Sequence, residues 1–518
     1  MQSKTLERDL RSLTAGGCFF DQQTLGQYSS DRCWYKITPL CVIQPTSADE
    51  VSAIAAYCNE GGIPLIPRGA ATGLAGQAIG MGVILDFTKL MNAILSVSND
   101  SASVQPGLVL GTLNAELAKN ERFFPVDPAS AAECTLGGMI GTNASGAHGV
   151  RYGATKDHVQ SLTLVLSNGE QVVLRDPPFV DSAMNPFMND IAGALTPLLL
   201  ANAGTIKSRF PDVRKNSSGY NLKDAVAGKD VDFRKLIVGS EGTLAIVVEA
   251  TLNTAIRPKV RLGALIYLSS YDHATDATLL ALELGPSAIE ILDHTYVSLA
   301  KGFKPSIDRL ILDEAKALLY VEFEGNVPQD IQRSILQLSK AVSLSHPLKF
   351  MPLTTEEDLR SLWELREQAS RVINSGTSVN KASFIEDVAV PVKHLPNYIT
   401  GLGRILNNYG IEFSLYGHAG TGNIHCAAFV DLTDLRHYRI IDNVALEVYD
   451  LAIGLGGTLS GEHGDGFVRT PFLQRLYGRE VFELFRTVKH TFDPNNILNP
   501  GKITGDQHAT ILHDLNLP

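Results

Sequence analysis

The stretch Pro67-Arg-Gly-Ala-Ala-Thr-Gly-Leu-Ala-Gly-Gln77 joins two apolar runs that have the character of β-strands. It lacks the Gly-Lys-Ser/Thr ending of a Walker A loop and the G-x-G-x-x-G spacing of a Rossmann fold, which argues against both nucleotide folds. A run of small residues can instead expose successive backbone N–H groups and form a concave site for an anion such as a pyrophosphate. Taken alone, the stretch is equally well interpreted as a tight turn between strands.

Two more glycine-rich loops follow, Ala132-Glu-Cys-Thr-Leu-Gly-Gly-Met-Ile-Gly-Thr-Asn-Ala-Ser-Gly146 and Leu236-Ile-Val-Gly-Ser-Glu-Gly-Thr-Leu-Ala-Ile246. Small residues let a flat ligand lie against the backbone, and the interleaved Thr, Asn and Ser residues offer short hydrogen-bonding groups. Three such loops in the first half of the chain favour one large phosphorylated cofactor over three unrelated turns.

Short β-branched runs alternate with helical patterns around these loops. Cys41-Val-Ile-Gln44 and Gly82-Val-Ile-Leu-Asp86 have the composition of strands. Residues 47–58 form a helical pattern that begins with a capping box of Ser47 and Glu50. This mixture indicates an α/β or α+β domain that ends near Arg257-Pro258, after which residues 259–480 again combine strands with long helices.

Four residues near the C-terminal end, His418, His425, Glu462 and His463, lie in two further glycine-rich segments. Two imidazoles and one carboxylate suit a metal site that keeps open positions and acts as a Lewis acid. His463 could accept a proton near neutral pH. The turn Gly420-Thr-Gly422 can bring the rings of His418 and His425 to the same side of the chain. Ordinary loop or core histidines are the alternative interpretation.

Composition restricts the class of protein. A chain of 518 residues predicts two or three domains, and a net charge of −11 argues against nucleic acid as a partner. The six cysteines contain no C-x-x-C pair, which argues against a zinc ribbon or an iron–sulfur cluster and fits a reducing compartment. The sequence has no signal-type segment and no membrane-spanning run, so we expect a cytoplasmic protein.

In this order, the segments resemble the FAD-linked oxidase family, which has the vanillyl-alcohol-oxidase-type flavin fold. The resemblance runs from Thr38 to Ile503, and it is greatest to the branch of D-2-hydroxy acid dehydrogenases that includes D-lactate and D-2-hydroxyglutarate dehydrogenases. It implies an α+β fold with a two-subdomain FAD-binding domain and an α+β substrate or cap domain. The implied division is an N-terminal helical segment (1–37), the FAD-binding domain (38–256), the cap domain with the metal site (257–485) and a C-terminal segment that returns to the FAD domain (486–518).

The resemblance also implies which residues contact the cofactor, FAD. They come from the three glycine-rich loops and from the closing Asn-Pro-Gly-Lys segment. The expected FAD-binding residues are Pro67, Arg68, Gly69, Ala70, Ala71, Thr72, Gly73, Gly76, Gln77, Thr135, Gly137, Gly138, Gly141, Thr142, Asn143, Ser145, Gly146, Glu241, Gly242 and Asn499.

For the reaction itself, the resemblance implies that His418, His425 and Glu462 hold a divalent metal (Zn, Mn or Fe) and that His463 is the base. Arg366, in a W-x-x-R segment, and Lys381 would anchor the substrate. Ser370 lies four residues after Arg366, so the two share one face of a predicted helix. The alternative for Arg366 is a solvated charge paired with a neighbouring glutamate.

The sequence also departs from the family pattern. Thr421 replaces an Asp of the usual H-x-G-D-G-N motif. Ala427 replaces an Asn that D-2-hydroxyglutarate enzymes use to contact substrate, which weakens that particular assignment. The segments Phe384-Ile-Glu-Asp-Val-Ala-Val-Pro391 and Gly461-Glu-His-Gly-Asp-Gly-Phe-Val-Arg469 are similar to those of longer relatives that append an iron–sulfur half.

The expected activity is the FAD-dependent, metal-assisted oxidation of a D-2-hydroxy acid to the 2-oxo acid. Electrons would pass to a separate protein or quinone, for which an iron–sulfur subunit is one candidate, and this acceptor could bring the chain to the inner membrane. A homodimer is compatible with this picture. Two alternatives stay open: an oxygen-using flavin oxidase of the same fold, and a non-catalytic flavin-binding subunit of an electron-transfer complex.

Overall fold

A small mixed sheet forms from apolar runs near the N-terminus in the computed structural model, which describes residues 2–175, 179–180, 185–375, 380–431, 434–507 and 509–511. Its order is β1 (Cys18–Phe19), β2 (Cys41–Ile43), β4 (Val83–Asp86) and β3 (Leu65–Arg68). Strands β2, β4 and β3 run parallel, so β2 must be joined to β3 by a crossover, which is helix α3 (Ala48–Gly61).

Helix α3 begins and ends at the residues that its sequence predicts. The Ser47 side chain accepts from the N–H of Glu50, and Gly62 (φ 60°) ends the helix in the left-handed conformation. The Glu50 carboxylate departs from the predicted capping box. It accepts from the backbone N–H groups of Ala15 and Thr46, so it ties the N-terminal segment to the helix instead.

A second, antiparallel sheet follows. Its order is β10 (Phe179–Val180), β9 (Gln171–Arg175), β8 (Val159–Val165), β13 (Ile246–Asn253), β6 (Ser101–Val104) and β5 (Ile94–Val97). Buried and half-buried residues alternate along β13, as expected of a strand with one face on the core. Helices α5 (Leu136–Thr142) and α10 (Phe233–Ile237) pack against this sheet. Residues 2–256 are called the N-terminal region below. Its other α-helices and strands are α1 (Gln2–Ser12), α2 (Gln22–Tyr28), α4 (Leu110–Leu117), β7 (Arg122–Phe123), α6 (Gly149–Tyr152), α7 (Pro186–Ala201), α8 (Ala203–Arg209), α9 (Leu222–Ala225), β11 (Val226–Ala227), β12 (Asp230–Val231) and β14 (Ala255–Ile256).

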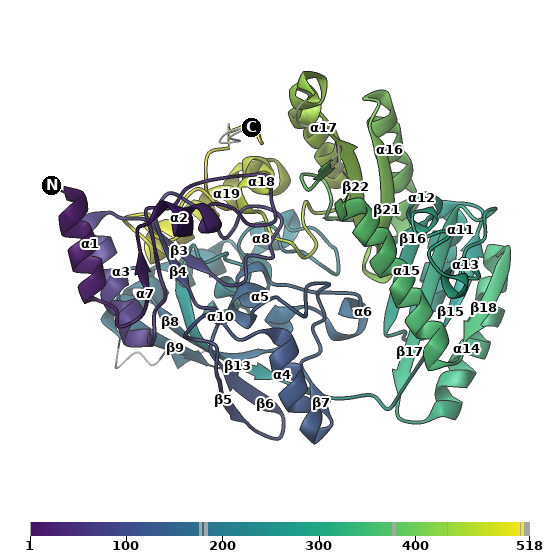
Figure 1. The fold of residues 1–518 in the computed structure, drawn as a ribbon, viewed down its shortest axis with the longest axis horizontal. Helices are drawn as coiled ribbons and strands as arrows, with labels where there is room; N and C mark the ends of the chain where they lie inside the picture. The colour runs from purple at the N-terminus through teal and green to yellow at the C-terminus, as the bar shows by residue number, and fades with distance from the viewer. Residues whose placement is uncertain are drawn as a thin grey trace.

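The central region, residues 260–455, is built on one antiparallel sheet, at the right of Figure 1. Its order is β18 (Lys349–Leu353), β15 (Val260–Leu268), β17 (Ala317–Gly325), β16 (Ala288–Asp293), β21 (Glu412–His418), β22 (Asn423–Val430) and β19 (Asn380–Ala382), and β20 (Val388–Ala389) also pairs with β22. Ala264 and Ile266 of β15 belong to one apolar cluster, whereas Leu265 and Tyr267 belong to another. Both faces of this strand are therefore covered, which explains its continuous apolar run.

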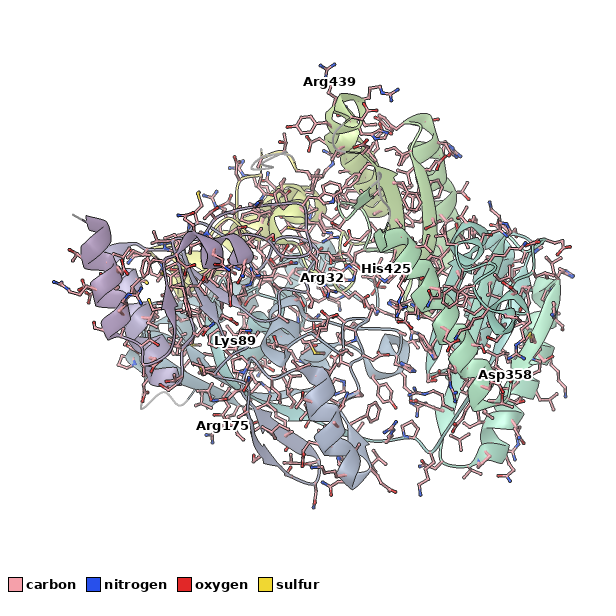
Figure 2. The ribbon with its side chains drawn as sticks, in the orientation of Figure 1. Arg32, Lys89, Arg175, Asp358, His425 and Arg439 are labelled. Carbon is pink, nitrogen blue, oxygen red and sulfur yellow. The ribbon has the colours of Figure 1, made fainter. Side chains whose placement is uncertain are left out.

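Helices cover the central sheet. The first apolar cluster contains residues of α11 (Tyr271–Leu282), α14 (Pro328–Val342) and α16 (Leu395–Asn408). The second contains residues of α12 (His294–Ser298), α13 (Pro305–Asp308) and α15 (Glu356–Ser375). Helix α17 (Leu435–Gly454) packs against α16, and the labelled Arg439 lies at the outer tip of α17 in Figure 2.

The C-terminal segment, residues 456–511, returns to the N-terminal region, as its yellow trace in Figure 1 shows. It contains α18 (Gly466–Arg469) and α19 (Leu473–Phe492), which contacts α7 and α8. Leu498 then forms a parallel bridge with Leu65 of β3, and the N–H of Asn499 donates to the carbonyl of Leu65. The edge of the first sheet is thus covered by residues from the far end of the chain.

The α+β fold with a returning C-terminal segment confirms the sequence prediction. The segment before residue 38 contains the helices α1 and α2 and the short strand β1. None of the described helices combines the length and the apolar character that a bilayer crossing requires.

Candidate functional site

The hairpin of β21 and β22 brings His418 and His425 together. Tyr416 pairs with His425 across the hairpin, and a one-turn 3-10 helix (Ala419–Thr421) followed by Gly422 (φ 73°) makes the turn. A Cβ on Gly422 would lie 1.9 Å from the carbonyl oxygen of Val390, so glycine is required there. The two Nε2 atoms end 3.3 Å apart, and Figure 2 shows His425 where the central and N-terminal regions meet.

Glu462 and His463 reach the same place from the C-terminal segment. Gly464 (φ 79°) and Gly466 (φ 50°) bend the backbone after them. Oε1 of Glu462 lies 3.2 Å from Nε2 of His418 and 3.2 Å from Nε2 of His425. It also lies 3.6 Å from Nε2 of His463, whose ring stacks on that of His425. We call the possible ligands His418, His425 and Glu462, together with the adjacent His463, the three-ligand cluster.

The outer nitrogens of the two ligand histidines are already occupied. Nδ1 of His418 lies 2.6 Å from the Glu290 carboxylate, and Nδ1 of His425 lies 3.2 Å from the carbonyl oxygen of Glu386. Since both partners only accept, each Nδ1 carries a proton, and each ring directs its Nε2 to the same carboxylate oxygen. Burial lowers the pKa of His418, but Glu290 and Glu462 raise it above its usual value. A second proton on His418 or a bound cation can therefore occupy the space between these three atoms.

The spacing of these three atoms fits a metal ion. Ligand atoms placed about 2.0–2.1 Å from a tetrahedral ion lie about 3.3–3.4 Å from one another. The observed separations are 3.2, 3.2 and 3.3 Å. Burial, His418 and His463 together lower the pKa of His425, which keeps this ring neutral, as a metal ligand must be. Ligand atoms of Asp387, His425, Glu462 and His463 also lie within 4.8 Å of one another, so this part of the chain offers further carboxylate and imidazole donors.

Lys215, from the N-terminal region, completes the surroundings of Glu462. Its ammonium donates to Oε2 of Glu462 at 2.8 Å and to the carbonyl of Gly146 at 2.9 Å, and the residue is buried. Although burial raises the pKa of Glu462, Lys215 and His418 hold it well below its usual range. Lys215 therefore keeps this carboxylate ionised and turns its other oxygen toward the histidines.

His463 is oriented by two acidic residues. Its Nδ1 lies 3.1 Å from Oε1 of Glu386, whose Oε2 accepts from the fully buried Arg469 at 2.6 Å. Its backbone N–H donates to Asp387 at 2.8 Å. Burial lowers the pKa of His463 but Asp387 and Glu386 raise it, to about 8. Because Glu386 accepts from Nδ1, Nε2 is the ring nitrogen that faces Glu462 and remains available to a ligand.

The residues expected to position the substrate, Arg366, Ser370 and Lys381, differ in how they relate to the three-ligand cluster. Nη1 of Arg366, on α15, lies 2.9 Å from Oε2 of Glu290, and its guanidinium stacks over Trp363. The hydroxyl of Ser370 lies 2.8 Å from that of Tyr296, so it faces a tyrosine. Lys381 lies in β19, and its side chain falls outside the described residues.

The loop after β3 presents a row of backbone donors. The described residues supply no acceptor to the N–H groups of residues 69–74, and Ala71 (φ 54°) adopts the left-handed conformation. Successive free N–H groups around a left-handed residue form a concavity suited to an anion. A Cβ on Gly69 would lie 2.1 Å from the hydroxyl of Thr135, which shows how closely this loop approaches the second one. Arg68 instead donates to the carbonyls of Tyr28, Ser30 and Ala78, and so fixes the flank of the loop.

The other two loops and the C-terminal segment complete this surface. Thr135 caps α5, which carries Gly137, Gly138, Gly141 and Thr142, and Asn143 (φ 52°) ends the helix. Beyond it, the described residues supply no acceptor to the buried N–H groups of residues 145–147. Asn499 donates to the carbonyls of Gln77 and Glu241, and Gln77 donates to the carbonyl of His463 at 2.6 Å. These contacts join the expected cofactor loops to the three-ligand cluster, and the unpartnered N–H groups fit a cofactor that carries phosphates.

A second histidine–carboxylate cluster joins the N-terminal region to β17. His148 places Nδ1 2.5 Å from Asp127 and Nε2 2.7 Å from Glu322. Arg261 contacts Glu322 at 3.1 Å and Glu324 at 2.9 Å, and Arg151 contacts Glu324 at 3.2 Å. Burial lowers the pKa of His148, but Asp127 and Glu322 raise it to about 10. We call this group the seam cluster, because it ties two regions together.

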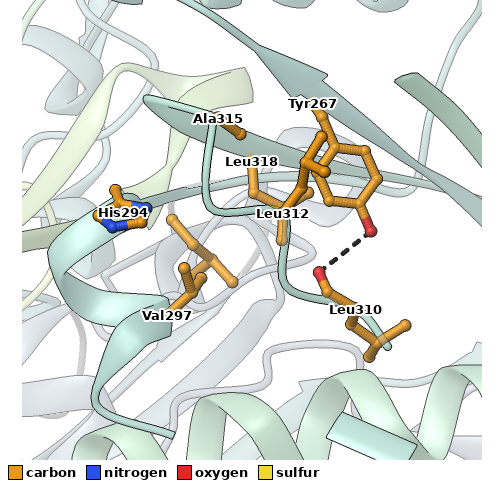
Figure 3. A pocket seen from close by; sticks show the side chains of 8 residues that line it. Tyr267, His294, Val297, Leu310, Leu312, Ala315 and Leu318 are labelled. Atoms are coloured by element: carbon orange, nitrogen blue, oxygen red, sulfur yellow. Dashed lines mark hydrogen bonds between the residues drawn. The ribbon is translucent and has the colours of Figure 1, made fainter. Parts of the chain in front are cut away.

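Two cavities lie away from these clusters. One, of about 10 Å³, lies inside the central region beside Tyr267 and His294, and Tyr267 donates there to the carbonyl of Leu310 (Figure 3). It has room for about one water molecule. The other, of about 550 Å³, lies along α19 and the residues after it.

The sequence predictions missed several residues of the site. Glu290 and Lys215 come from segments without a recognisable motif, so only the fold reveals them. Glu386, Asp387 and Arg469 lie in the two segments that carry the family resemblance, residues 384–391 and 461–469, and their charges within these segments were the available signal.

Comparisons with known families and proteins agree with this arrangement. The family described as FAD binding domain matches residues 39–175, and the family described as FAD linked oxidases, C-terminal domain, matches residues 257–503. A D-lactate dehydrogenase of Anaerostipes hadrus is 31% identical over 482 residues, which cover 90% of each chain. A D-2-hydroxyglutarate dehydrogenase of Pantoea ananatis is 30% identical over 92% of this chain but 49% of its own, so the present chain spans about half of that relative's length. The glycolate oxidase subunit GlcD of Bacillus subtilis is 29% identical over 93% of both chains.

Solved structures share the fold. The 4-ethylphenol oxidase of Gulosibacter chungangensis superposes with a TM-score of 0.72 at 16% identity and covers 98% of both chains. A p-cresol methylhydroxylase superposes with a TM-score of 0.69 at 14% identity, again over 98% of both chains. At these identities the likeness shows the fold alone.

Proposed function

Because this chain belongs to the FAD-linked oxidase family, we propose that it is a flavin-dependent dehydrogenase that oxidises a D-2-hydroxy acid to the 2-oxo acid. The observation that carries the proposal is the three-ligand cluster, in which two imidazole nitrogens and one carboxylate oxygen lie 3.2–3.3 Å apart beside His463. The names of the relatives, D-lactate and D-2-hydroxyglutarate dehydrogenase, support the same substrate class.

In this proposal the chain's residues form two binding sites, one for FAD and one for a divalent metal. FAD would lie on the free N–H groups of residues 69–74 and 145–147, and it supplies the acceptor for a hydride. A divalent metal (Zn, Mn or Fe) would be held by His418, His425 and Glu462, and as a Lewis acid it lowers the pKa of a hydroxyl group. We place the FAD-binding domain at residues 38–256 and the cap domain at residues 257–485.

His463 is the proposed base. Its Nε2 accepts the hydroxyl proton, while Glu386 holds the Nδ1 proton and fixes the ring. Arg366 donates to the substrate carboxylate with the guanidinium nitrogens that Glu290 leaves open, and Lys381 and Ser370 help to position the substrate. Electrons then leave through a separate protein or quinone, which would be the chain's link to a membrane.

The test is anaerobic titration of the purified, FAD-loaded chain with a panel of D- and L-2-hydroxy acids, with and without a chelator. We expect a D-2-hydroxy acid to bleach the flavin, a chelator to prevent bleaching, and added Zn²⁺ or Mn²⁺ to restore it. Unchanged flavin absorbance with every hydroxy acid, metal present, would rule out the dehydrogenase in favour of a flavin-binding subunit. Hydrogen peroxide formed in air as fast as a dye is reduced would identify an oxidase instead.

A further inference from the structure

A short segment of the N-terminal region lies between the second glycine-rich loop and the three-ligand cluster. Residues 215–219, which we call the connector, belong to no helix or strand. Lys215, Ser217 and Ser218 of the connector are buried, with exposed fractions of 5% or less. Because buried polar groups are paired inside a protein, the partners of the connector show which parts of the fold it holds together.

Lys215 bridges the second glycine-rich loop and a proposed metal ligand. Its ammonium donates to the carbonyl of Gly146 at 2.9 Å and to Oε2 of Glu462 at 2.8 Å. A Cβ on Gly149 would lie 2.7 Å from Cε of Lys215, so the lysine stem also packs against the residues that follow the loop. A displacement of Gly146 therefore changes the contact that holds Glu462, and the reverse is equally true.

Ser217 makes a second bridge between the same two segments. Its hydroxyl lies 3.1 Å from the carbonyl oxygen of Gly461 and 3.3 Å from that of Asn143. Its backbone N–H donates to the carbonyl of Ser460 at 2.9 Å, and the hydroxyl of Ser218 accepts from the N–H of Ser460 at 3.0 Å. The connector thus contacts the end of α5 on one side and the segment that carries Glu462 on the other.

The two sides of the connector are the two places where ligands would bind. On one side, the buried N–H groups of residues 145–147 receive no acceptor from the described residues, and a buried N–H without an acceptor is unfavourable. Acceptors supplied by FAD would stabilise this loop and its contacts with the connector. On the other side, a metal would fix Oε1 of Glu462, which lies 3.2 Å from Nε2 of both His418 and His425.

We propose that the connector, chiefly through Lys215, positions FAD and the metal relative to each other, so that each binds more tightly when the other is present. This inference rests on the two binding sites of the proposed function and does not depend on its substrate. Each ligand would order one side of the same hydrogen-bond network, so the second ligand meets a site that is already ordered. Lys215 is a positioning residue in this proposal, because it acts through Gly146 and Glu462.

The experiment measures how the FAD affinity depends on the metal. The FAD-loaded chain is diluted in series, with saturating Zn²⁺ or with a chelator, and the fluorescence of released FAD gives a dissociation constant in each condition. The ratio of the two constants is the coupling factor. We expect Zn²⁺ to tighten FAD binding by about fivefold or more, within the usual range of such couplings. The Zn²⁺ affinity measured with and without FAD should change by the same factor, because a coupling between two binding sites is reciprocal.

The variant Lys215→Met tests the bridge. It removes the ammonium and keeps an unbranched stem, so the coupling factor should fall to about one. Lys489→Met is the matched control, because Lys489 is also buried and donates to the Asp493 carboxylate and to the carbonyls of Thr243 and Leu498. The control should keep the coupling factor of the unmodified chain. A purely structural defect weakens FAD binding equally with and without Zn²⁺, so it leaves the factor unchanged.

The variant Ser217→Ala keeps the test decisive if Lys215→Met does not fold. It removes only the hydroxyl between Asn143 and Gly461, and the loss of one hydrogen bond should lower the coupling factor about twofold or more. Ser167→Ala is its control, because Ser167 is buried and its hydroxyl donates to the carbonyl of Phe492. This control should leave the factor unchanged, and circular dichroism verifies that each variant folds.

The outcomes separate this inference from the proposed function. Equal FAD affinity with and without bound Zn²⁺ would overturn the coupling and leave both binding sites intact. A full coupling factor in the folded Lys215→Met and Ser217→Ala variants, or its equal loss in Lys489→Met, would overturn the role of the connector. A coupled, metal-loaded chain whose flavin no hydroxy acid bleaches would support the connector and overturn the dehydrogenase. A chain that fails to bind FAD or Zn²⁺ would overturn both proposals.

Discussion

The three-ligand cluster and the seam cluster are both built from buried histidines and carboxylates, yet they distribute their hydrogen-bond acceptors differently. In the seam cluster, each nitrogen of His148 has a carboxylate of its own, so one imidazolium satisfies both. In the three-ligand cluster, the Nε2 atoms of His418 and His425 share one oxygen of Glu462. An Nε2 that shares its acceptor with a second ring can still bind a cation. A histidine with a separate acceptor for each ring nitrogen already has all its hydrogen bonds.

The charge count leads to the same distinction. In the seam cluster, Asp127, Glu322 and Glu324 face Arg151, Arg261 and a protonated His148, so this group is neutral without any further ion. In the three-ligand cluster, Arg366, Lys215 and Arg469 pair with Glu290, Glu462 and Glu386. The fourth carboxylate, Asp387, lies 3.8 Å from Nδ1 of His463. The charge of this cluster therefore depends on its histidines, and a bound cation would change it.

The largest expected effect concerns the histidine next to the ligands. His463→Ala should lower turnover by about 10²–10⁴-fold, the usual range for loss of a general base. Bound metal, measured by elemental analysis, should stay unchanged, because His463 is not one of the three ligands. Turnover within a factor of a few of the unmodified enzyme would remove His463 from the role of base.

Breaking the closed network should destabilise the fold and leave the chemistry alone. Glu322 is fully buried and bonds His148, Arg261 and Tyr320. Glu322→Gln should lower the free energy of unfolding by about 3–5 kcal/mol, as expected when a buried ion pair loses one partner. Denaturant unfolding measures this change. Loss of bound metal in the folded variant would contradict the separation of the two clusters.

Removing the hydrogen-bond partner of a ligand histidine should lower the metal affinity without abolishing metal binding. Glu290→Gln removes the carboxylate that holds Nδ1 of His418, and outer partners of metal ligands typically contribute about 10–100-fold to affinity. Competition with a chromogenic chelator measures the dissociation constant. A variant with unchanged affinity would show that Glu290 does not orient His418.

The smallest expected effect is a pH dependence of the seam cluster. Because the pKa of His148 in the folded chain is raised to about 10, its stabilisation is fully present below the unfolded value and is lost as pH rises toward 10. The stability difference between the unmodified chain and His148→Asn should therefore shrink by at most about 1.4 kcal/mol per pH unit between pH 7 and 9. Urea unfolding at several pH values measures it, and a constant difference would argue against a charged His148.

The sequence predicts the parts of the site that local chemistry determines. The glycines of Gly420-Thr-Gly422 indicate a turn that brings His418 and His425 to one side, and the structure has that turn. Gly461 and Gly464 likewise predict a bent backbone around Glu462 and His463, and Gly464 (φ 79°) adopts the left-handed conformation there. These features could be predicted because a tight turn imposes residue types on its own sequence.

Contacts between distant segments could not be predicted in this way. Lys215 reaches Glu462 from the other end of the fold, and nothing in its own neighbourhood requires a lysine. The position of Arg366 could be predicted from its helix, but its pairing with Glu290 of β16 depends on the packing of α15 against the sheet. Such partners follow from tertiary packing, which no single segment encodes.

The bridge between Leu65 and Leu498 has a consequence for biosynthesis. Strand β3 emerges from the ribosome early, but the residues that cover its open edge are translated near the end. At about 5–20 residues per second, the interval is roughly 20–90 s. During this interval the nascent chain exposes an unpaired strand edge, which can pair with other chains. Folding without aggregation therefore requires that this edge is covered until translation ends.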